Sequence, residues 1–167
     1  MGFSDKTIIP QQITFLNYVT LGHESKIADI AFLGNAKKSK MTNYCQKIFP
    51  KARPHFYDIQ LNNWDINKPW NIEKYDLVIC NRTTMFCESL SFLLKELKAC
   101  ISHNSIVFFD FTIYKDLINN PRRRGPDFTR IEQVLIEQEM KPNIIISQKG
   151  TDETGDRIVY TCWKSLF

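Results

Sequence analysis

KPNIIISQKGTDETGDRIVYTCWK, residues 141–164, is the stretch that decides the fold. Two β-prone runs within it, Lys141–Lys149 and Arg157–Lys164, flank the polar segment Gly150–Asp156, which contains two glycines. No helix fits between the two runs, so we expect them to pair as an antiparallel β-hairpin. The sequence therefore predicts a sheet that ends in a C-terminal hairpin.

Upstream of this hairpin, segments with strand and helix character alternate. Short apolar runs bounded by turn residues predict strands at Lys26–Leu33, Pro54–Gln60, Tyr75–Cys80 and Ser105–Phe111. Apolar residues at helical spacing predict helices at Ile9–Leu21, from Ser39 or Thr42 to about Phe49, at Glu88–Cys100 and at Thr129–Met140. Turns are expected at Gly34-Asn35 and Ser102-His103-Asn104, and the last helix should be capped by Asp127 and stopped by Pro142.

The alternation predicts an α/β fold, a three-layer sandwich whose twisted sheet is mostly parallel before the C-terminal hairpin. One domain should span residues 1–167, with residues 1–25 as an N-terminal helical cap. Ligands of such sheets bind beyond the carboxyl ends of the strands, at the point where the strand order reverses. Polar residues that follow strands are therefore the candidates for a functional site.

Composition limits the classes of function. The net charge of +4 allows an anionic partner without requiring one, and no specific feature supports nucleic acid. We find no apolar stretch of the roughly 18–20 residues that a membrane helix needs and no signal-peptide pattern, so we expect a cytoplasmic protein without a membrane partner. The five cysteines form no C-x-x-C pair and the three histidines are scattered, so neither a disulfide framework nor a metal site is expected.

Three segments resemble the class I S-adenosylmethionine-dependent methyltransferases, whose fold is Rossmann-like. IADIAFLGN (Ile27–Asn35) occupies the place of the family's first strand and glycine-rich loop. KYDLVICN (Lys74–Asn81), followed by a helix and SIVFFDF, resembles the fourth strand, the helix and the fifth strand. The final helix and hairpin resemble the family's closing helix and antiparallel strand pair, which ordinary Rossmann dehydrogenases lack.

The resemblance implies S-adenosylmethionine as the cofactor. Its glycine-rich loop would include Gly34 and Asn35, and Asp58, at the end of the second strand, would accept hydrogen bonds from the ribose hydroxyls. Asp65 would take the adenine-side position. The first motif departs from the family's pattern, because Phe32 replaces the acidic residue, and Ala36 and Lys38 replace the second and third glycines.

Two residues at strand ends are candidates for catalysis. Asn81 follows the Tyr75–Cys80 strand, where the family places residues that orient the methyl acceptor or contact the cofactor, and it is equally suited to capping a turn. Asp110 lies near the end of the Ser105–Phe111 strand, either in a cleft or at an exposed edge. Arginines that could grip an anionic substrate, or be solvated in loops, are Arg82, Arg122, Arg123 and Arg124.

Three hypotheses for the function follow. The first is a small S-adenosylmethionine-dependent methyltransferase that acts on a small-molecule or anionic substrate. The second is a methyltransferase-like fold that has lost catalysis and serves as a binding or scaffold module. The third is a binder of a different nucleotide-like ligand, with Lys37, Lys38 and Lys40 holding its phosphate. The sequence does not define the oligomeric state.

Overall fold

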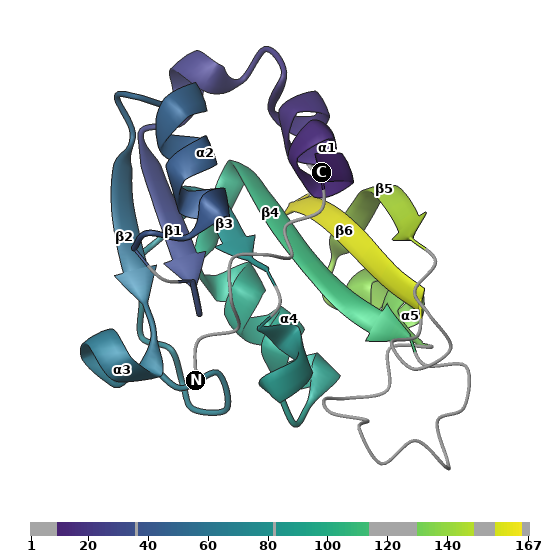
Figure 1. Cartoon of the computed structure of the whole chain (residues 1–167). Coiled ribbons are helices and arrows are strands. Elements are labelled where there is room, and N and C mark those ends of the chain that lie inside the picture. The colour runs from purple at the N-terminus through teal and green to yellow at the C-terminus, as the bar shows by residue number, and fades with distance from the viewer. Residues whose placement is uncertain (1–9, 36, 82, 114–129, 149–155, 165–167) are drawn as a thin grey trace.

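The computed structural model describes residues 10–35, 37–81, 83–113, 130–148 and 156–164, and their centre is one sheet (Figure 1). Its strands lie in the order β2-β1-β3-β4-β6-β5. They are β1 (Asp29–Leu33), β2 (Arg53–Tyr57), β3 (Tyr75–Cys80), β4 (Ile101–Ile113), β5 (Met140–Gln148) and β6 (Asp156–Lys164). The first four strands pair in parallel, whereas β6 runs antiparallel to both β4 and β5. The predicted α/β fold with a mostly parallel sheet is confirmed.

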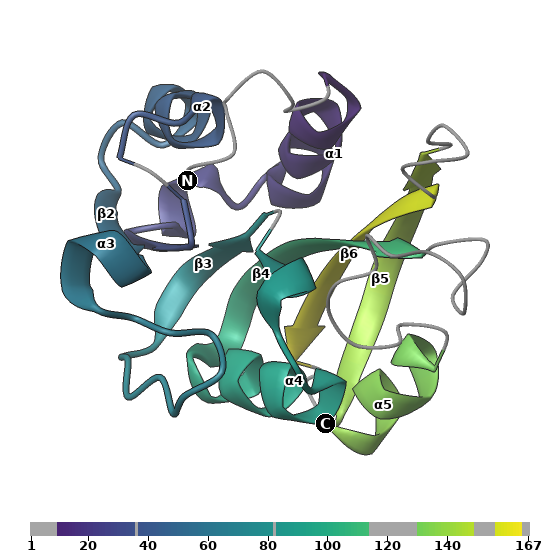
Figure 2. The ribbon, with the colours of Figure 1, turned by 60° about the horizontal axis from the view of Figure 1, so that its bottom comes forward.

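Helices cover both faces of this sheet, which gives three layers (Figure 2). The α-helices are α1 (Pro10–Thr20), α2 (Lys40–Ile48), α3 (Ile59–Asn62), α4 (Leu90–Ala99) and α5 (Ile131–Glu137). Two short 3-10 helices are η2 (Glu24–Lys26) and η3 (Thr84–Phe86). Helices α1 and α2 lie on one face, and α4 and α5 lie on the other. Within the described parts of the chain, no helix combines the length and the apolar character needed to span a membrane.

The sequence of the longer helices explains where they begin and which side they bury. The Ser39 hydroxyl caps α2 by accepting a hydrogen bond from the Thr42 N–H, and the Ser89 hydroxyl caps α4 in the same way. In α4 the leucines at helical spacing, Leu90, Leu93, Leu94 and Leu97, are buried in the core on one face of the sheet. Helix α1 contributes Phe15, Leu16 and Val19 to the core on the other face.

Two predictions for the central part of the chain were wrong. The second strand ends at Tyr57 rather than Gln60, because Asp58 caps α3, a helix that the sequence did not reveal. The expected turn at residues 102–104 instead belongs to β4, which begins at Ile101. There, the Ser105 hydroxyl accepts a hydrogen bond from the Ser102 N–H (2.8 Å) and donates to the Tyr75 carbonyl, so it holds the irregular start of β4 beside β3.

Predictions near the C-terminal end have mixed outcomes. Helix α5 begins at Ile131 with no side-chain cap from Arg130, later than the predicted start, and it ends at Glu137, before Met140. Asp127, the predicted cap, lies outside the described residues, as do residues 149–155 between β5 and β6.

Backbone features of β2 hinder the pairing of another strand at this exposed edge of the sheet. The Arg53 N–H donates to the Ala28 carbonyl (2.8 Å), so alternation along the strand directs the backbone groups of Pro54 and Phe56 away from β1. Pro54 has no N–H to donate, and the Phe56 carbonyl accepts a hydrogen bond from the Asn62 side chain (2.9 Å). These features discourage pairing with another strand.

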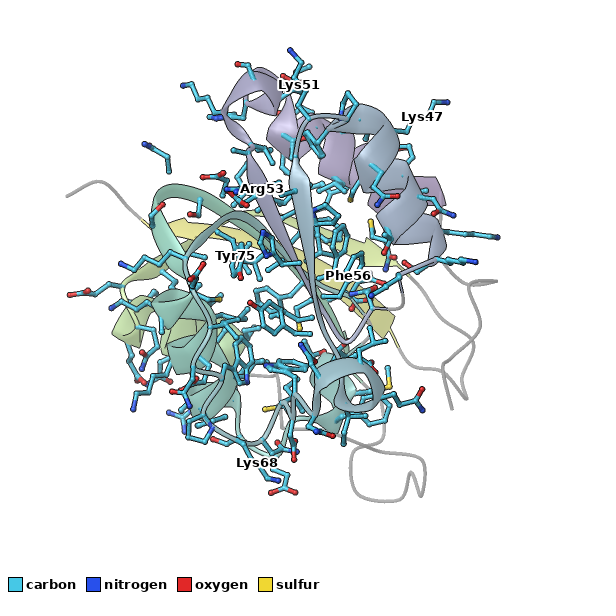
Figure 3. The ribbon with its side chains drawn as sticks, turned by 90° about the vertical axis from the view of Figure 1, so that its left-hand side faces the viewer. Lys47, Lys51, Arg53, Phe56, Lys68 and Tyr75 are labelled. Atoms are coloured by element: carbon cyan, nitrogen blue, oxygen red, sulfur yellow. The ribbon has the colours of Figure 1, made fainter. Side chains whose placement is uncertain are left out.

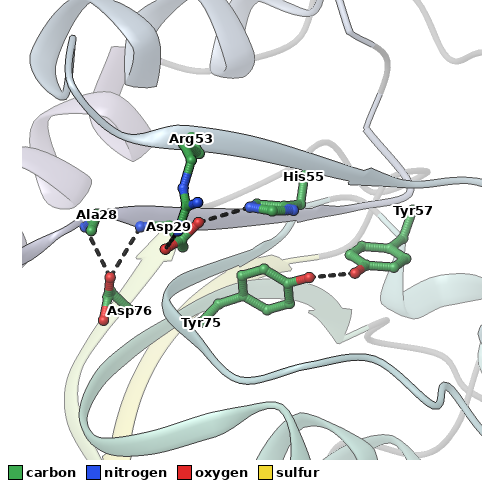
Figure 4. A network of polar contacts seen from close by, with 7 residues as sticks. All are labelled: Ala28, Asp29, Arg53, His55, Tyr57, Tyr75 and Asp76. Carbon is green, nitrogen blue, oxygen red and sulfur yellow. Dashed lines mark hydrogen bonds and ion pairs between the residues drawn. The ribbon is translucent and has the colours of Figure 1, made fainter.

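A polar network connects the first residues of β1, β2 and β3 at the amino edge of the sheet (Figure 4). The Asp29 carboxylate is 2.8 Å from both the Arg53 guanidinium and the His55 ring nitrogen. Asp76 accepts hydrogen bonds from the N–H groups of Ala28 and Asp29, at 2.8 and 3.0 Å. The hydrogen bonds from Arg53 and His55 hold the pKa of Asp29 below its ordinary value of 3.8.

Two tyrosines continue this row toward the carboxyl edge. The hydroxyl groups of Tyr57 and Tyr75 are hydrogen-bonded, and the Tyr75 ring packs against His55 at a centroid distance of 4.9 Å. Burial, followed by the hydrogen bond to Tyr57, raises the pKa of Tyr75. The row therefore contributes a packed and neutral layer beside the ionic cluster.

We expect the Asp29→Asn variant to show a small loss of thermal stability with a defined pH dependence. Because the pKa of Asp29 is lowered on folding, its contribution is present above the unfolded value and is lost as pH falls through the lower folded value. The midpoint of thermal unfolding at pH 7 should fall by about 1–2 °C, since Arg53 is largely exposed and solvent weakens the pair. Calorimetry from pH 7 down to about pH 3 should show wild type and variant converging; a constant difference would contradict this account.

Candidate functional site

Polar residues gather where β1, β3 and β4 end, at the carboxyl edge of the sheet. Gly34 follows β1 with a φ of 69°, a left-handed conformation that favours glycine, and its N–H donates to the Tyr57 carbonyl (2.7 Å). Next to it, Asn35 is buried and its side-chain amide donates to the Leu33 carbonyl (3.1 Å). The predicted turn after the first strand is thus held by hydrogen bonds to its own strand and to the end of β2.

Thr83 occupies the space that Gly34 leaves open. A Cβ atom at Gly34 would lie 2.4 Å from both Oγ1 and Cγ2 of Thr83. The Thr83 hydroxyl is fixed by contacts with the carbonyls of Leu33 (3.0 Å) and Asn81 (3.2 Å). Part of the need for a glycine at this position therefore comes from a side chain of the loop after β3, which sequence reasoning did not identify as a partner of the first loop.

The two predicted catalytic residues, Asn81 and Asp110, are brought together through a third residue. Both are buried, with Asp110 only 1% exposed. The Asn81 amide donates to the Gln12 side-chain oxygen, and the Gln12 amide donates to the Asp110 carboxylate, each at 3.1 Å. Asp110 lies in the interior rather than at an exposed edge, and Thr84 donates a hydrogen bond to its backbone carbonyl. The site thus contains a carboxylate and an amide group in a dry environment.

Gln12 was missed by sequence reasoning, although the sequence carries a signal for it. It lies on α1 at positions i−3, i−4 and i−7 relative to Phe15, Leu16 and Val19, so it interrupts an apolar face. A polar side chain on a buried face needs a partner, and Gln12, which is 2% exposed, finds two of them, Asp110 in β4 and Asn81 just after β3. The N-terminal helix is therefore part of the candidate site as well as a cover for the sheet.

Asp58 lies at the end of β2, as predicted, and is partly buried. Its Oδ1 accepts a hydrogen bond from the Gln60 N–H (2.8 Å), and its own N–H donates to the Asn62 side chain (2.9 Å). A carboxylate can accept more hydrogen bonds than the one from Gln60, so Asp58 can combine a structural role with ligand binding.

Asp65 lies in the segment after α3 and makes local contacts. Its carboxylate accepts a hydrogen bond from the Asn67 N–H (3.0 Å) and lies 3.6 Å from the Lys68 ammonium group. Beside it, the Trp64 indole N–H is buried with no hydrogen-bond partner among the described residues, whereas the Trp70 indole N–H donates to Ile66. An orphaned donor of this kind is unusual and suits a position that a ligand acceptor could fill.

The other predicted site residues are not placed together with this group. Arg82 and Arg122, Arg123 and Arg124 lie outside the described residues. The loop before α2 and its first residue carry the exposed side chains of Lys37, Lys38 and Lys40.

The described cysteine thiols do not have the properties of nucleophiles. Cys45, Cys80, Cys87 and Cys100 are free and buried. Burial raises the pKa of Cys45 and of Cys100 to about 12. Burial, reinforced by the charge of Asp110, raises the pKa of Cys80 well above its ordinary value. These four thiols therefore serve the core, and the chemical candidates at the carboxyl edge remain oxygen and amide groups.

Comparison with known proteins identifies the fold. No protein-family model matches the chain, and no curated protein matches it in sequence. Among solved structures, N-methyltransferase NodS from Bradyrhizobium japonicum WM9, in complex with S-adenosylhomocysteine, superposes with a TM-score of 0.68 at 11% identity, covering 93% of this chain and 86% of NodS. The chain has the fold of class I S-adenosylmethionine-dependent methyltransferases.

Two further structures support the same fold. Burkholderia thailandensis 1,6-didemethyltoxoflavin-N1-methyltransferase, also with S-adenosylhomocysteine, has a TM-score of 0.67 at 11% identity, with 93% and 77% of the two chains covered. TehB from Haemophilus influenzae has a TM-score of 0.72 at 13% identity, with 96% of this chain and 64% of TehB covered. At these identities the likeness establishes the methyltransferase-like fold.

The residues present fit the family's cofactor in part. The Asp58 carboxylate and the orphaned Trp64 N–H provide an acceptor and a donor of the kinds that a ribose and a purine need. The loop at Gly34 fits less simply, because Thr83 fills the space above the glycine. On balance the donor and acceptor set is compatible with S-adenosylmethionine, with Thr83 forming one wall beside the first loop.

We expect Gly34→Ala to destabilise the protein through Thr83. The left-handed backbone and the collision with Thr83 should together lower the free energy of unfolding by about 2–4 kcal/mol in urea titrations. In a Thr83→Ala background, which removes both of the closest atoms, the same change should cost at least about 1 kcal/mol less. Equal costs in the two backgrounds would show that the collision does not matter.

Gln12→Leu should also destabilise the fold, because it removes hydrogen bonds to a buried amide and a buried carboxylate. We expect the free energy of unfolding to fall by about 2–3 kcal/mol. Gln46→Leu, at an exposed position on α2, is the matched control and should change it by no more than about 0.5 kcal/mol. Equal effects of the two substitutions in urea titrations would exclude a structural role for the Gln12 bridge.

Proposed function

We propose that this protein is a small S-adenosylmethionine-dependent methyltransferase. The observation that carries the proposal is the convergence of buried Asn81, which follows β3, and buried Asp110, in the neighbouring part of β4, within a fold shared with methyltransferases crystallised with S-adenosylhomocysteine. Ligand sites of open α/β sheets lie at this edge. Asn81 and Asp110 therefore lie where such sheets bind ligands, and both side chains can orient a methyl acceptor.

In this proposal the cofactor lies against the ends of β1 and β2. Asp58 accepts hydrogen bonds from the ribose hydroxyls, and Gly34 and Asn35 line the first loop. Asp65 and Asn81 complete the cofactor contacts. When bound, S-adenosylmethionine supplies an electrophilic methyl group next to its positively charged sulfur.

Asn81 and Asp110 hold the methyl acceptor. The Asn81 amide orients it through a hydrogen bond, and the Asp110 carboxylate accepts a hydrogen bond or a proton from the attacking atom. In this structure Gln12 is hydrogen-bonded to both groups. A methyl acceptor would take over these two hydrogen bonds from Gln12. The buried position of the pair also excludes water, which strengthens these contacts.

The acceptor is proposed to be a small or anionic molecule, since Lys37 and Lys38 follow the first loop and are exposed at the same edge. The arginines at positions 82 and 122–124 are further candidates for contacts with an anion. We place the activity in the cytoplasm, the compartment in which free thiols such as the four described in this structure stay reduced.

Two observations favour an inactive binding module as a second candidate. Thr83 fills the space above Gly34, and the first motif carries Phe32, Ala36 and Lys38 in place of the family's acidic and glycine residues. Both features reduce the room and the hydrogen-bond acceptors available to the cofactor. Direct measurement of cofactor binding separates the two candidates.

Asp58→Asn is the sharpest test of the cofactor site. Asparagine also caps helices well, so α3 should remain intact, but the loss of charge should weaken binding of S-adenosylhomocysteine by about tenfold or more. Titration calorimetry measures the affinity, and thermal unfolding checks the fold. Glu137→Gln, an exposed carboxylate on α5, serves as the control and should bind like wild type.

The outcomes are distinct. Absence of binding to wild type at millimolar ligand would overturn the methyltransferase proposal and favour the inactive module. Binding that Asp58→Asn leaves unchanged would retain the cofactor and remove Asp58 from its site.

A further inference from the structure

The positive charge of this protein is concentrated in one segment. Residues 34–57 contain no aspartate or glutamate, and their six basic residues are Lys37, Lys38, Lys40, Lys47, Lys51 and Arg53. The rest of the chain has 16 basic and 18 acidic residues, so without this segment the net charge would be −2 rather than +4. A mild overall charge therefore hides a strong local asymmetry, which is a feature of surfaces that bind polyanions.

The fold places this charge along the outer side of α2. The helix buries Met41, Thr42 and Cys45 against the sheet, and this leaves Lys40 and Lys47, two turns apart, exposed. Lys37 and Lys38 extend the row before the helix and Lys51 extends it beyond the other end, all three exposed. Figure 3 shows Lys47 and Lys51 near one end of the molecule, far from Lys68 at the other.

Four of the lysines in this row contribute no ion pair to the described part of the fold. Lys37, Lys38, Lys47 and Lys51 form no ion pair within the described ranges, in contrast to Arg53, which pairs with Asp29. The first turn of α2 contains no acidic residue that would offset the lysines near the positive end of the helix dipole. Repulsion among the lysines is relieved when an anionic partner binds.

The shape of the row indicates the kind of partner. The nine residues of α2 span about 13 Å, and lysines flank it on both sides. A single phosphate would contact only one end of such a row, whereas a chain of phosphates can follow its whole length. The row also starts at Lys37, two residues after Asn35 in the candidate site, so a strand bound on α2 would lead to the carboxyl edge of the sheet.

We propose that the outer surface of α2 and its flanking loops, from Lys37 to Lys51, binds the phosphate backbone of a nucleic acid strand. This binding is independent of methyl transfer and requires no cofactor. It goes beyond the proposed function, because it assigns a macromolecular partner to a surface outside the Asn81 and Asp110 site. Affinity should come from the release of counterions and should therefore depend steeply on salt.

The test measures fluorescence anisotropy of a labelled oligouridylate of about 20 nucleotides, without cofactor, between about 50 and 200 mM salt. The triple variant Lys37→Gln, Lys38→Gln, Lys47→Gln should bind about tenfold or more weakly and should reduce the salt slope by about 2, since each phosphate contact on a single strand contributes about 0.7. A labelled single-stranded DNA of equal length should behave similarly, because phosphate contacts do not depend on the sugar.

The matched control is the triple variant Lys68→Gln, Lys74→Gln, Lys95→Gln, which removes the same charge from exposed positions elsewhere. It should keep the affinity of the wild type within about threefold. Equal losses in the two triple variants would overturn the proposal, because net charge would then explain the binding. No binding by wild type at low salt, or equal competition by polyglutamate, would overturn it as well.

Discussion

A buried carboxylate in β4, beside the point where β3 ends, imposes the constraint on which the site depends. Asp110 is almost completely removed from water, and such a charge is costly unless other groups solvate it. The Gln12 amide provides part of that solvation, from a helix 98 residues earlier in the chain, and its other end accepts from Asn81. One side chain thus links α1 to the ends of β3 and β4. Because buried polar groups need hydrogen-bond partners, these contacts fix the positions of Asn81, Asp110 and α1 relative to one another.

The loop after β1 is also tightly packed. Gly34 is required by its left-handed backbone and by Thr83, whose hydroxyl in turn contacts the carbonyls of Leu33 and Asn81. The loop after β1 and the loop after β3, which are separate in sequence, therefore pack against each other beyond the ends of these two strands. Any ligand at this edge meets Thr83 as a fixed wall. This differs from a glycine-rich loop that is open to a ligand, and it explains how a loop with one of three glycines can still be well packed.

The sequence predicted the architecture better than it predicted the site. The strand Tyr75–Cys80 was predicted with its observed bounds, because a short apolar run bounded by polar residues is typical of a buried strand in a parallel sheet. The short helix α3 escaped because Asp58 marks both a strand end and a helix cap. Thr83 gave no signal, since its role depends on a contact across 49 residues of chain. Gln12 did interrupt an apolar face, but spacing alone could not name Asn81 and Asp110 as its partners.

Two exposed surfaces of this fold differ in character: the strand edge at β2 is protected against pairing, whereas the outer surface of α2 carries exposed lysines. At β2, Pro54 and the hydrogen bond from Asn62 to Phe56 remove backbone groups that could recruit another strand. On and beside α2, Lys37, Lys38, Lys47 and Lys51 form no ion pair with the described residues, and no carboxylate lies between Asp29 and Asp58 in the sequence. Because these four lysines pair with none of the described carboxylates, this surface is suited to a partner that is recognised by its negative charge. Because that row begins at the first loop, a polyanion held there would approach the carboxyl edge without any rearrangement of the sheet.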